Sequence, residues 1–412
     1  MSGQQRRLQK LTIFLLLGFG LVGISLVYWQ LRAPVILARE DNPRILEQLY
    51  RIERGQIVDN SGEVLATNTG TPFRIRRHYP FPEAAPFVGY YSYIHGASGV
   101  ELGLGEVLSG ETDSVSQNLE RELLHTPRIG RDVRLTINMA WQSRAAELLS
   151  QRQGGMLLMA LPDGAIRVMV SHPTFDPNLL DEQFQDLVAD ENAPLLNRTT
   201  QGQFPPGGVI GPLVRAVAIS ENKASLETSL TEVAEAFSID ELDEIFRTLG
   251  LTAGPDLPIE VADEVGSPSI DAHNAVRGQD SLTVTPVQMA RAWGSVANGG
   301  VLPVPRLISA IKSESGEWQA VSREETEALI PFSEQAANII LNNMARQQNV
   351  AELASTALSG PAGERVAWYV GLAPAADPRY VLVVVVENAE YADEAADIGR
   401  ALLQDVITSG DP

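Results

Sequence analysis

The segment GMLLMALPDGAIRVMVS (residues 155–171) carries two apolar runs on either side of Pro162-Asp163-Gly164. The Asp-Gly pair supplies the positive-φ residue that a tight antiparallel turn needs, so the segment predicts a β-hairpin. Two further strands are expected near the C-terminus, at residues 366–373 and 380–387. The second of these is almost entirely valine, which predicts a central strand in a sheet that is covered on both faces.

Helical patterns surround these strands. Asn138 is suited to cap a helix that runs to about residue 150, after a strand-like run from residue 132. Pro286 fits the first turn of another helix. Further helices are expected at residues 209–218, 230–249 and 390–408. Hairpin-linked strands with separate helices predict an α+β fold, in which an antiparallel sheet is flanked by helices.

The N-terminal part resembles a membrane anchor in length and composition. Residues 11–31 contain no charged side chain, and 21 residues at a rise of 1.5 Å each span about the 30 Å hydrocarbon core of a bilayer. Arg6, Arg7 and Lys10 precede this run, so the positive-inside rule predicts a cytoplasmic tail and an extracytoplasmic body. A cleaved signal peptide is the alternative, but its apolar run is usually only about 7–15 residues long. We expect a retained single-pass anchor in the cell membrane.

Four parts are expected along the chain: a cytoplasmic tail (1–10), a transmembrane anchor (11–31), a linker with a smaller β-rich domain (32–131), and the α+β domain (132–412). A short amphipathic helix is expected to end the linker before residue 54. Residues 54–68 predict a hairpin that turns at Asp59-Asn60-Ser61-Gly62. Residues 71–110, rich in Pro, Gly and aromatic side chains, predict irregular β structure. We interpret Arg74, Arg76 and Arg77 within them as a solvated or lipid-facing basic patch.

The composition excludes several classes of function. The net charge is −21, and residues 1–54 carry eight basic and four acidic side chains, so the rest of the chain carries −25. An acidic body repels phosphate backbones, which argues against nucleic-acid partners. The chain has no Cys and its five His are scattered, so neither a metal site nor a cofactor is expected. Only Lys10, Lys223 and Lys312 are lysines.

Seven segments follow one another in a characteristic order: residues 54–66 (RGQIVDNSGEVLA), 88–110, 133–149, 162–178 (PDGAIRVMVSHPTFDPN), 197–207, 284–300 (VTPVQMARAWGSVANGG) and 367–374 (AWYVGLAP). In this order they resemble the class B penicillin-binding proteins, the membrane-anchored bacterial transpeptidases that cross-link peptidoglycan. The resemblance implies a transpeptidase-like α+β domain and makes the smaller domain a pedestal of the dimerisation type.

The resemblance also implies three catalytic motifs, and this chain departs from each. In Ser-x-x-Lys the serine attacks the peptide carbonyl and the lysine takes its proton, but Gly208 and Gly211 stand at these positions. The place for Lys-Thr-Gly-Thr reads Leu358-Ser359-Gly360-Pro361, without the cation that binds a carboxylate. The best candidate for Ser-x-Asn is Ser229-Leu230-Thr231, which lacks the Asn.

These departures predict a pseudoenzyme without catalytic residues. It would serve as a structural or regulatory partner of cell-wall synthase or division proteins, and contact with peptidoglycan itself stays open. The alternative is an acyl-transferring D,D-transpeptidase or penicillin-binding sensor with a non-standard nucleophile, although Ser359 has no base beside it in the sequence. We also hypothesise that Gly208 and Gly211 let the facing strand approach closely and shut the former cleft.

Overall fold

The computed structural model describes residues 3–37, 52–71, 74–111, 129–263, 269–313, 315–321, 328–360 and 363–410. They form two compact units. The first comprises residues 1–52 with 70–75, and the second comprises residues 53–69 with 76–412.

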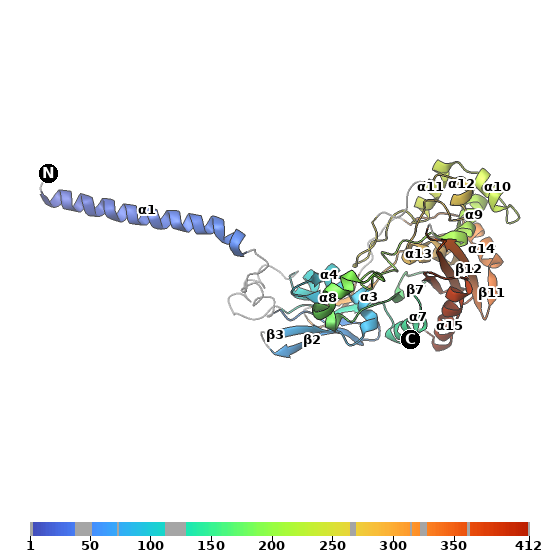
Figure 1. Cartoon of the computed structure of the whole chain (residues 1–412), viewed down its shortest axis with the longest axis horizontal. Coiled ribbons are helices and arrows are strands. Elements are labelled where there is room, and N and C mark those ends of the chain that lie inside the picture. Colours follow the sequence, from blue (N-terminus) through green and yellow to red (C-terminus); the bar gives the residue numbers. More distant parts are fainter. Residues whose placement is uncertain are drawn as a thin grey trace. The chain divides into compact units, whose positions relative to one another are not determined.

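The main element of the first unit is α1 (Gly3–Leu37) (Figure 1). Within it, Lys10–Gln30 has a mean hydropathy of 2.3, and none of this segment is buried. One N-terminal apolar helix therefore fits a single-pass membrane anchor, as predicted. The helix continues to Leu37, beyond residue 31, where the anchor was expected to end. The amphipathic helix expected before residue 54 lies mostly outside the described residues.

The core of the second unit is a six-stranded antiparallel sheet in the order β11-β12-β13-β14-β7-β8. Its strands are β7 (Gly154–Ala160), β8 (Ile166–His172), β11 (Ala345–Gln347), β12 (Val350–Leu358), β13 (Arg365–Ala373) and β14 (Tyr380–Val386). The predicted hairpin is β7–β8. Strand β14 lies between β13 and β7 and is buried along its whole length, which confirms the prediction of a covered central strand.

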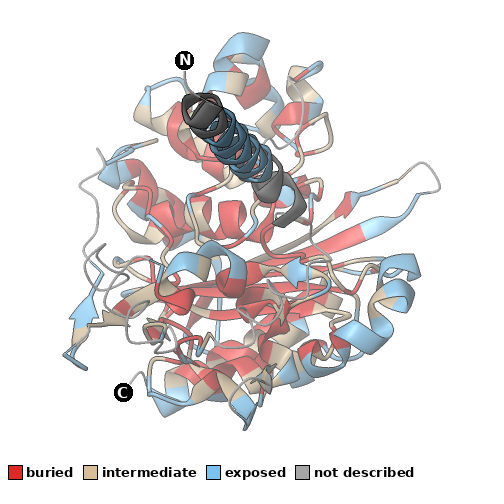
Figure 2. Ribbon diagram, turned by 90° about the vertical axis from the view of Figure 1, so that its left-hand side faces the viewer, coloured by how far each residue is buried: buried red, intermediate tan, exposed pale blue. Residues whose placement is uncertain are grey.

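Alternate residues of β14 face two different layers of helices, because successive side chains of a strand point to opposite faces. Leu382 and Val384 pack in one hydrophobic cluster with α7 (Met139–Leu149) and α15 (Asp393–Ser409). Val383 and Val385 pack in the other with α9 (Gly211–Ser220) and α13 (Pro286–Ala297). Figure 2 shows the buried strands between helices whose outward surfaces are exposed. The α+β prediction is confirmed.

A second sheet, in the order β10-β9-β6-β1-β2-β3, lies in the N-terminal part of the fold and includes strands from the middle of the chain. Its strands are β1 (Ile57–Val58), β2 (Val64–Thr71), β3 (Arg74–His78), β6 (Val133–Leu135), β9 (Ile308–Lys312) and β10 (Trp318–Ala320). Strands β1 and β2 form the predicted hairpin, whose turn is held by the Asp59 carboxylate, which accepts from the N–H groups of Ser61 and Glu63.

Residues 71–110 differ from the irregular β structure that was expected, because short helices alternate with the short strands. They contain β3, η1 (Pro82–Ala84), α3 (Ala85–Val88), β4 (Tyr91–Ser92), β5 (Gly96–Ala97), α4 (Gly99–Gly103) and α5 (Gly105–Ser109). The stretch is rich in Pro and Gly, which break regular strands and shorten every element.

The basic patch expected around residue 77 is only partly on the surface. Arg76 is exposed, but the Arg77 side chain is 2% exposed and pairs with the fully buried Glu101 at 2.6 Å. Arg54 pairs with the same carboxylate at 2.8 Å. Burial raises the pKa of the neighbouring Tyr79, and the Glu101 charge adds to the rise. The solvated reading of Arg77 was therefore wrong, since a buried carboxylate recruits both guanidinium groups.

The helices differ from the predictions in two ways: one predicted helix is divided, and others were not predicted. The single helix expected over residues 230–249 is two, α10 (Leu230–Glu235) and α11 (Ile239–Thr248), because Ser238 caps the second with a capping box to Glu241. The remaining helices of the described residues are η2 (Pro177–Leu179), α8 (Leu180–Ala189), η3 (Gly207–Val209), α12 (Ala272–Ala275) and α14 (Glu334–Asn343). Of these, α8, α12 and α14 were not predicted.

Candidate functional site

The chain enters α9 through η3, and buried contacts fix its path there. The indole N–H of Trp368 donates to the carbonyl of Pro205 at 2.8 Å, and that of Trp293 donates to the carbonyl of Val209 at 3.1 Å. The Gly207 N–H donates to the carbonyl of Gly278 at 2.9 Å. These bonds tie the segment to β13, to α13 and to the loop at Gly278.

Strand β12 passes so close to η3 that neither glycine there has room for a side chain without a shift. Gly207 has φ +56°, and a Cβ on it would lie 2.8 Å from the Ala357 Cβ and 2.9 Å from the Thr356 oxygen. A Cβ on Gly208 would lie 2.6 Å from the Ser355 Oγ. Ser355 and Ala357 share one face of the strand, and that face meets the two glycines.

Gly211 lies one helical turn further on and is covered by a leucine. A Cβ on Gly211 would lie 3.2 Å from both terminal methyl groups of Leu230. Leu230 opens α10, whose capping box joins Ser229 to Glu232, and the neighbouring Thr231 hydroxyl accepts from Arg277 at 3.1 Å. The segment 229–231 thus lies beside Gly211, and a side chain at position 211 would need Leu230 to move by a few tenths of an ångström.

Leu358 and the two residues after it are not among the nearest atoms that a Cβ on Gly208 or Gly211 would meet. Leu358 ends β12 and is 56% exposed, and its backbone N–H donates to the Gln279 Oε1 at 3.0 Å. Ser359 donates its backbone N–H to the Glu364 carbonyl at 2.8 Å, in the turn that precedes β13 and also contains Gly360. Pro361 lies outside the described residues. The structure therefore brings Gly208 and Gly211 together with Ser355 and Leu230.

Among the described residues, Ser355 supplies the side-chain atoms within 4 Å of a Cβ built on Gly208. The Ser355 Oγ donates to the Thr356 carbonyl at 3.3 Å. Lys223, whose pKa is raised by its bonds to Glu241 and Glu221, lies over the Phe237 ring instead. Lys312 binds Asp132 at 2.9 Å. Both lysines beyond the apolar helix are thus engaged elsewhere. In the part of the chain that the structure describes, no three His, Asp or Glu side chains gather as a metal site would require.

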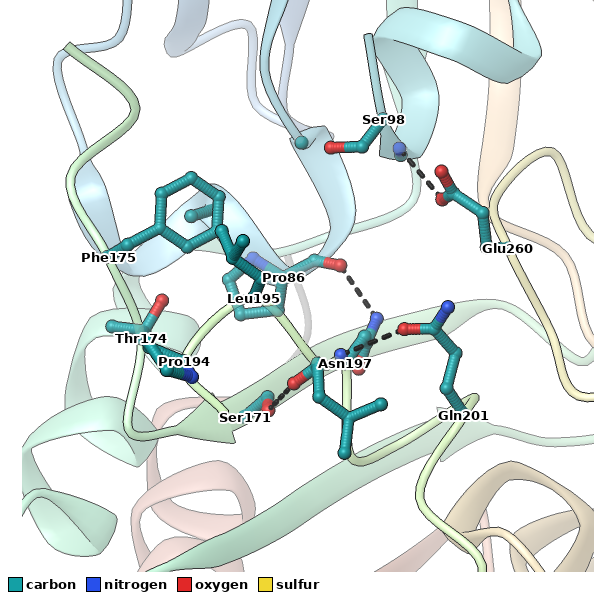
Figure 3. A pocket seen from close by; sticks show the side chains of 14 residues that line it. Pro86, Ser98, Ser171, Thr174, Phe175, Pro194, Leu195, Asn197, Gln201 and Glu260 are labelled. Carbon is teal, nitrogen blue, oxygen red and sulfur yellow. Dashed lines mark hydrogen bonds between the residues drawn. The ribbon is translucent and has the colours of Figure 1, made fainter. Parts of the chain in front are cut away.

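A separate cavity of about 70 Å³ lies between the stretch 85–99 and the stretch 171–201 (Figure 3). The Glu260 carboxylate on one side of it accepts from the Gly99 N–H at 2.8 Å. On another side, Asn197 donates its amide N–H to the Pro86 carbonyl at 2.6 Å. The cavity is well below the about 300–1,000 Å³ of ordinary ligand pockets, and Gly208 does not line it.

Two family models match the chain. The penicillin binding protein transpeptidase domain matches residues 154–233 and 225–406, and the penicillin binding protein A dimerisation domain matches residues 54–133. The chain belongs to the penicillin-binding protein transpeptidase family. With the dimerisation-domain match and the relatives below, it is a class B penicillin-binding protein, which confirms the resemblance seen in the sequence.

Known class B proteins match this one over most of its length. The peptidoglycan D,D-transpeptidase PbpA of Mycolicibacterium smegmatis is 26% identical over 453 residues, covering 90% of this chain and 92% of the relative. The peptidoglycan D,D-transpeptidase MrdA of Escherichia coli is 24% identical over 61% of this chain and 54% of the relative. The penicillin G acyl-enzyme complex of penicillin-binding protein A from M. tuberculosis superposes with a TM-score of 0.77 at 24% identity, over 86% of this chain and 99% of that one, which shows a shared fold.

Sequence reasoning missed the residues that face the glycines. Ser355 was overlooked although the run Leu353-Ala354-Ser355-Thr356 ends, like Lys-Thr-Gly-Thr, in a threonine. Leu230 was noted only as the middle of a degraded motif. Gln279, whose side chain bonds the end of β12, belongs to no motif, and nothing in the sequence alone marks it.

Proposed function

We propose that this penicillin-binding protein homologue is catalytically inactive and acts as a membrane-anchored structural or regulatory partner in peptidoglycan synthesis or cell division. The observation that carries the proposal is the packing of β12 against Gly207 and Gly208. Position 208 carries no nucleophile, and a side chain there would need the Ser355 hydroxyl to move.

The first support is chemical. A serine transpeptidase needs a nucleophile, a base to take its proton and a cation for the substrate carboxylate. Gly208 and Gly211 offer neither a hydroxyl nor an amine. Lys223 and Lys312 are bound to carboxylates of their own. Acyl transfer at this place therefore lacks all three groups.

The second support is steric. A peptide substrate that added to the edge of β12 would need the free backbone groups of that strand. The Leu358 N–H is already bonded to the Gln279 side chain, and the Thr356 oxygen lies against Gly207. The hypothesis that Gly208 lets the strand approach closely therefore agrees with the geometry. At Gly211 it does not hold, because the nearest atoms that a Cβ there would meet belong to Leu230 and the Val276 carbonyl and none to β12.

We further propose that the third motif corresponds to Leu353-Ala354-Ser355-Thr356, in place of residues 358–361. This placement puts Ser355 at the glycine of Lys-Thr-Gly-Thr, where it faces Gly208. Leu353 then takes the lysine position, so the carboxylate-binding cation is absent under either placement. Both placements lead to the same conclusion about activity.

The partner role rests on the contrast between the site and the rest of the protein. The pedestal-like segment and the apolar N-terminal helix are retained, while the catalytic groups are lost. The relatives named above are peptidoglycan D,D-transpeptidases, so cell-wall synthase or division proteins are the proposed partners. Residues 1–10 would lie in the cytoplasm and residues 32–412 outside it, divided into pedestal and transpeptidase-like domains near residue 131.

The alternative, an acyl-transferring enzyme or penicillin sensor, would need a different nucleophile. Ser355 is the hydroxyl nearest to Gly208, but its Oγ bonds a backbone carbonyl, and the hydrogen bonds of the described residues give it no lysine or histidine base. A general base must lie within hydrogen-bond reach of the proton that it removes. The alternative is therefore weaker. Labelling with a penicillin, described next, discriminates directly between it and the inactive homologue.

The test is covalent labelling of the full-length protein in detergent with a fluorescent penicillin. We expect no labelled band after denaturation, whereas M. smegmatis PbpA under the same conditions should give one. A PbpA variant whose catalytic serine is replaced by glycine serves as the matched negative control. A denaturation-resistant adduct on this chain would overturn the proposal, and mass spectrometry would identify the residue that carries it.

The partner role needs its own measurement. The tagged full-length protein should co-purify from membranes of its own cells with a cell-wall synthase or a division protein. A second tagged single-pass protein of similar abundance controls for non-specific recovery. Recovery of no such protein above that control would leave the inactive-homologue proposal standing and remove the partner role.

A further inference from the structure

An open groove lies beside the enclosed cavity of Figure 3 and shares two of its residues, Gly99 and Glu260. One wall is the short helix α4, which exposes 52% of Leu102. The other wall is the segment of residues 256–260, which contributes Leu257 and Asp256 among others. The volume is about 540 Å³, which falls in the range of sites that bind a ligand or a few side chains.

The two walls are held together by specific contacts. A Cβ on Gly103 would lie 2.3 Å from the Pro258 oxygen, so only a glycine permits the helix to approach the segment this closely. The Glu260 carboxylate accepts from the Gly99 N–H, and the Glu260 carbonyl accepts from the Thr200 hydroxyl at 2.8 Å. The groove is therefore preorganised, which lowers the entropy lost on binding.

The groove also joins two parts of the chain. Helix α4 lies within residues 54–133, which match the dimerisation domain, and the segment 256–260 lies within the transpeptidase match. A molecule bound in the groove would touch both at once. That position suits a partner that senses or fixes the pedestal against the transpeptidase-like domain.

The chemistry of the lining selects one kind of occupant. Asp256 and Glu260 are exposed carboxylates, and neither has a cationic partner among the described residues. Leu102, Leu257 and the Pro258 ring supply apolar surface next to them. An anionic lipid surface or a nucleic acid is repelled by these carboxylates and by the −25 charge beyond residue 54. Two carboxylates without a third ligand also fall short of a metal site.

We propose that this groove binds a basic, apolar segment of a partner protein. A lysine or arginine of that segment lies between Asp256 and Glu260, and a neighbouring apolar side chain packs on Leu102. The proposal rests on the proposed partner role and names the chemistry of the partner. Charge complementarity at a partly apolar groove favours both the rate of encounter and the orientation of the bound segment.

The test measures binding of a defined probe by fluorescence anisotropy. The full-length protein is held in nanodiscs of zwitterionic lipid, and the probe is a fluorescein-labelled nine-residue peptide of alternating leucine and lysine. Empty nanodiscs control for binding to lipid. We expect saturable binding that the Asp256→Asn/Glu260→Gln double variant weakens about tenfold. A peptide of alternating leucine and glutamate should not bind.

Matched variants separate a specific groove from general attraction to an acidic protein. The Glu235→Gln/Asp240→Asn double variant removes the same charge from exposed positions on other helices, and it should change binding less than twofold. Leu102→Ser should weaken binding, whereas Ile270→Ser, at a 76% exposed position, should not. If both double variants weaken peptide binding equally, or if the peptide shows no saturable binding, the groove proposal is overturned.

These outcomes are distinct from those that test the proposed function. If the groove proposal fails, the penicillin-labelling result is unchanged, so the inactive-homologue proposal would stand. A penicillin adduct would overturn the inactive homologue even if the peptide bound as expected. Circular dichroism of all four variants checks that each is folded before binding is compared.

Discussion

Restoring a serine at position 208 is expected to destabilise the protein unless Ser355 is shortened at the same time. The built Cβ at Gly208 lies 2.6 Å from the Ser355 Oγ and 3.3 Å from its Cβ, and real Cβ contacts are almost never below 3.0 Å. Gly208→Ser must therefore rotate or displace Ser355. The substitution also places a larger side chain between η3 and β12. Both of these elements are held in place by buried contacts.

The magnitude follows from three contributions. Overpacking a tight contact costs about 1–3 kcal/mol, and loss of the Ser355 bond to the Thr356 carbonyl costs about 1 kcal/mol. Replacing a glycine in a helical turn stabilises the folded protein by about 1 kcal/mol. Gly208→Ser should thus destabilise by about 1–3 kcal/mol. Ser355→Gly alone should cost about 1.5–2 kcal/mol, because it loses the same hydrogen bond and because glycine weakens a strand.

The double variant Gly208→Ser/Ser355→Gly should be more stable than the sum of the single changes by about 2–4 kcal/mol, because the overpacking is relieved and the hydrogen bond is lost only once. Urea unfolding of the full-length protein, followed by tryptophan fluorescence, measures the free energy of unfolding of the wild type, the two single variants and the double variant. Trp293 and Trp368 bond to the segment around η3 and report on it directly. Ala354→Gly is the matched control, since Ala354 packs in the opposite hydrophobic cluster and should show no coupling to position 208. A coupling below about 0.3 kcal/mol for the Ser355 pair would refute the close approach of β12.

Two further predictions concern charged groups outside the cleft. Glu101→Gln removes the partner of the buried Arg54 and Arg77 and should destabilise the protein by about 3–5 kcal/mol in the same urea assay, a loss that a change below about 1 kcal/mol would contradict. The pKa of Glu241 is lowered from 4.5 to about 2, first by the Ser238 backbone N–H and then by Lys223. Because the pKa of Glu241 is lowered in the folded state, its charge stabilises the protein above pH 4.5, and this stabilisation is lost as the pH falls toward 2. The Tm of wild type should therefore exceed that of Glu241→Gln by a constant amount near neutral pH, and the difference should shrink below pH 4.5. An advantage that grows on acidification would contradict this sign.

Much of the fold could be predicted because its signals are local. The turn at Asp163-Gly164 and the valine run of β14 encode neighbouring strands directly, and both lie where the sequence placed them. Caps at Asn138 and Thr285 fixed the beginnings of two helices. The division of residues 230–249 was missed because the capping box at Ser238 interrupts an otherwise continuous apolar pattern.

The candidate site likewise has features that the sequence determines and features that only the fold determines. The absence of a hydroxyl at position 208 and of an amine at position 211 is a property of the chain alone, since no fold adds a side chain to glycine. Which atoms lie against Gly208 depends on the register of β12 against β13, in which Ser355 pairs with Trp368. That register is set by contacts between residues far apart in the chain, so only the tertiary structure places Ser355 and Leu230 against the glycines. The burial of Arg77 has the same origin, because its partner Glu101 is brought to it by the folding of residues between them.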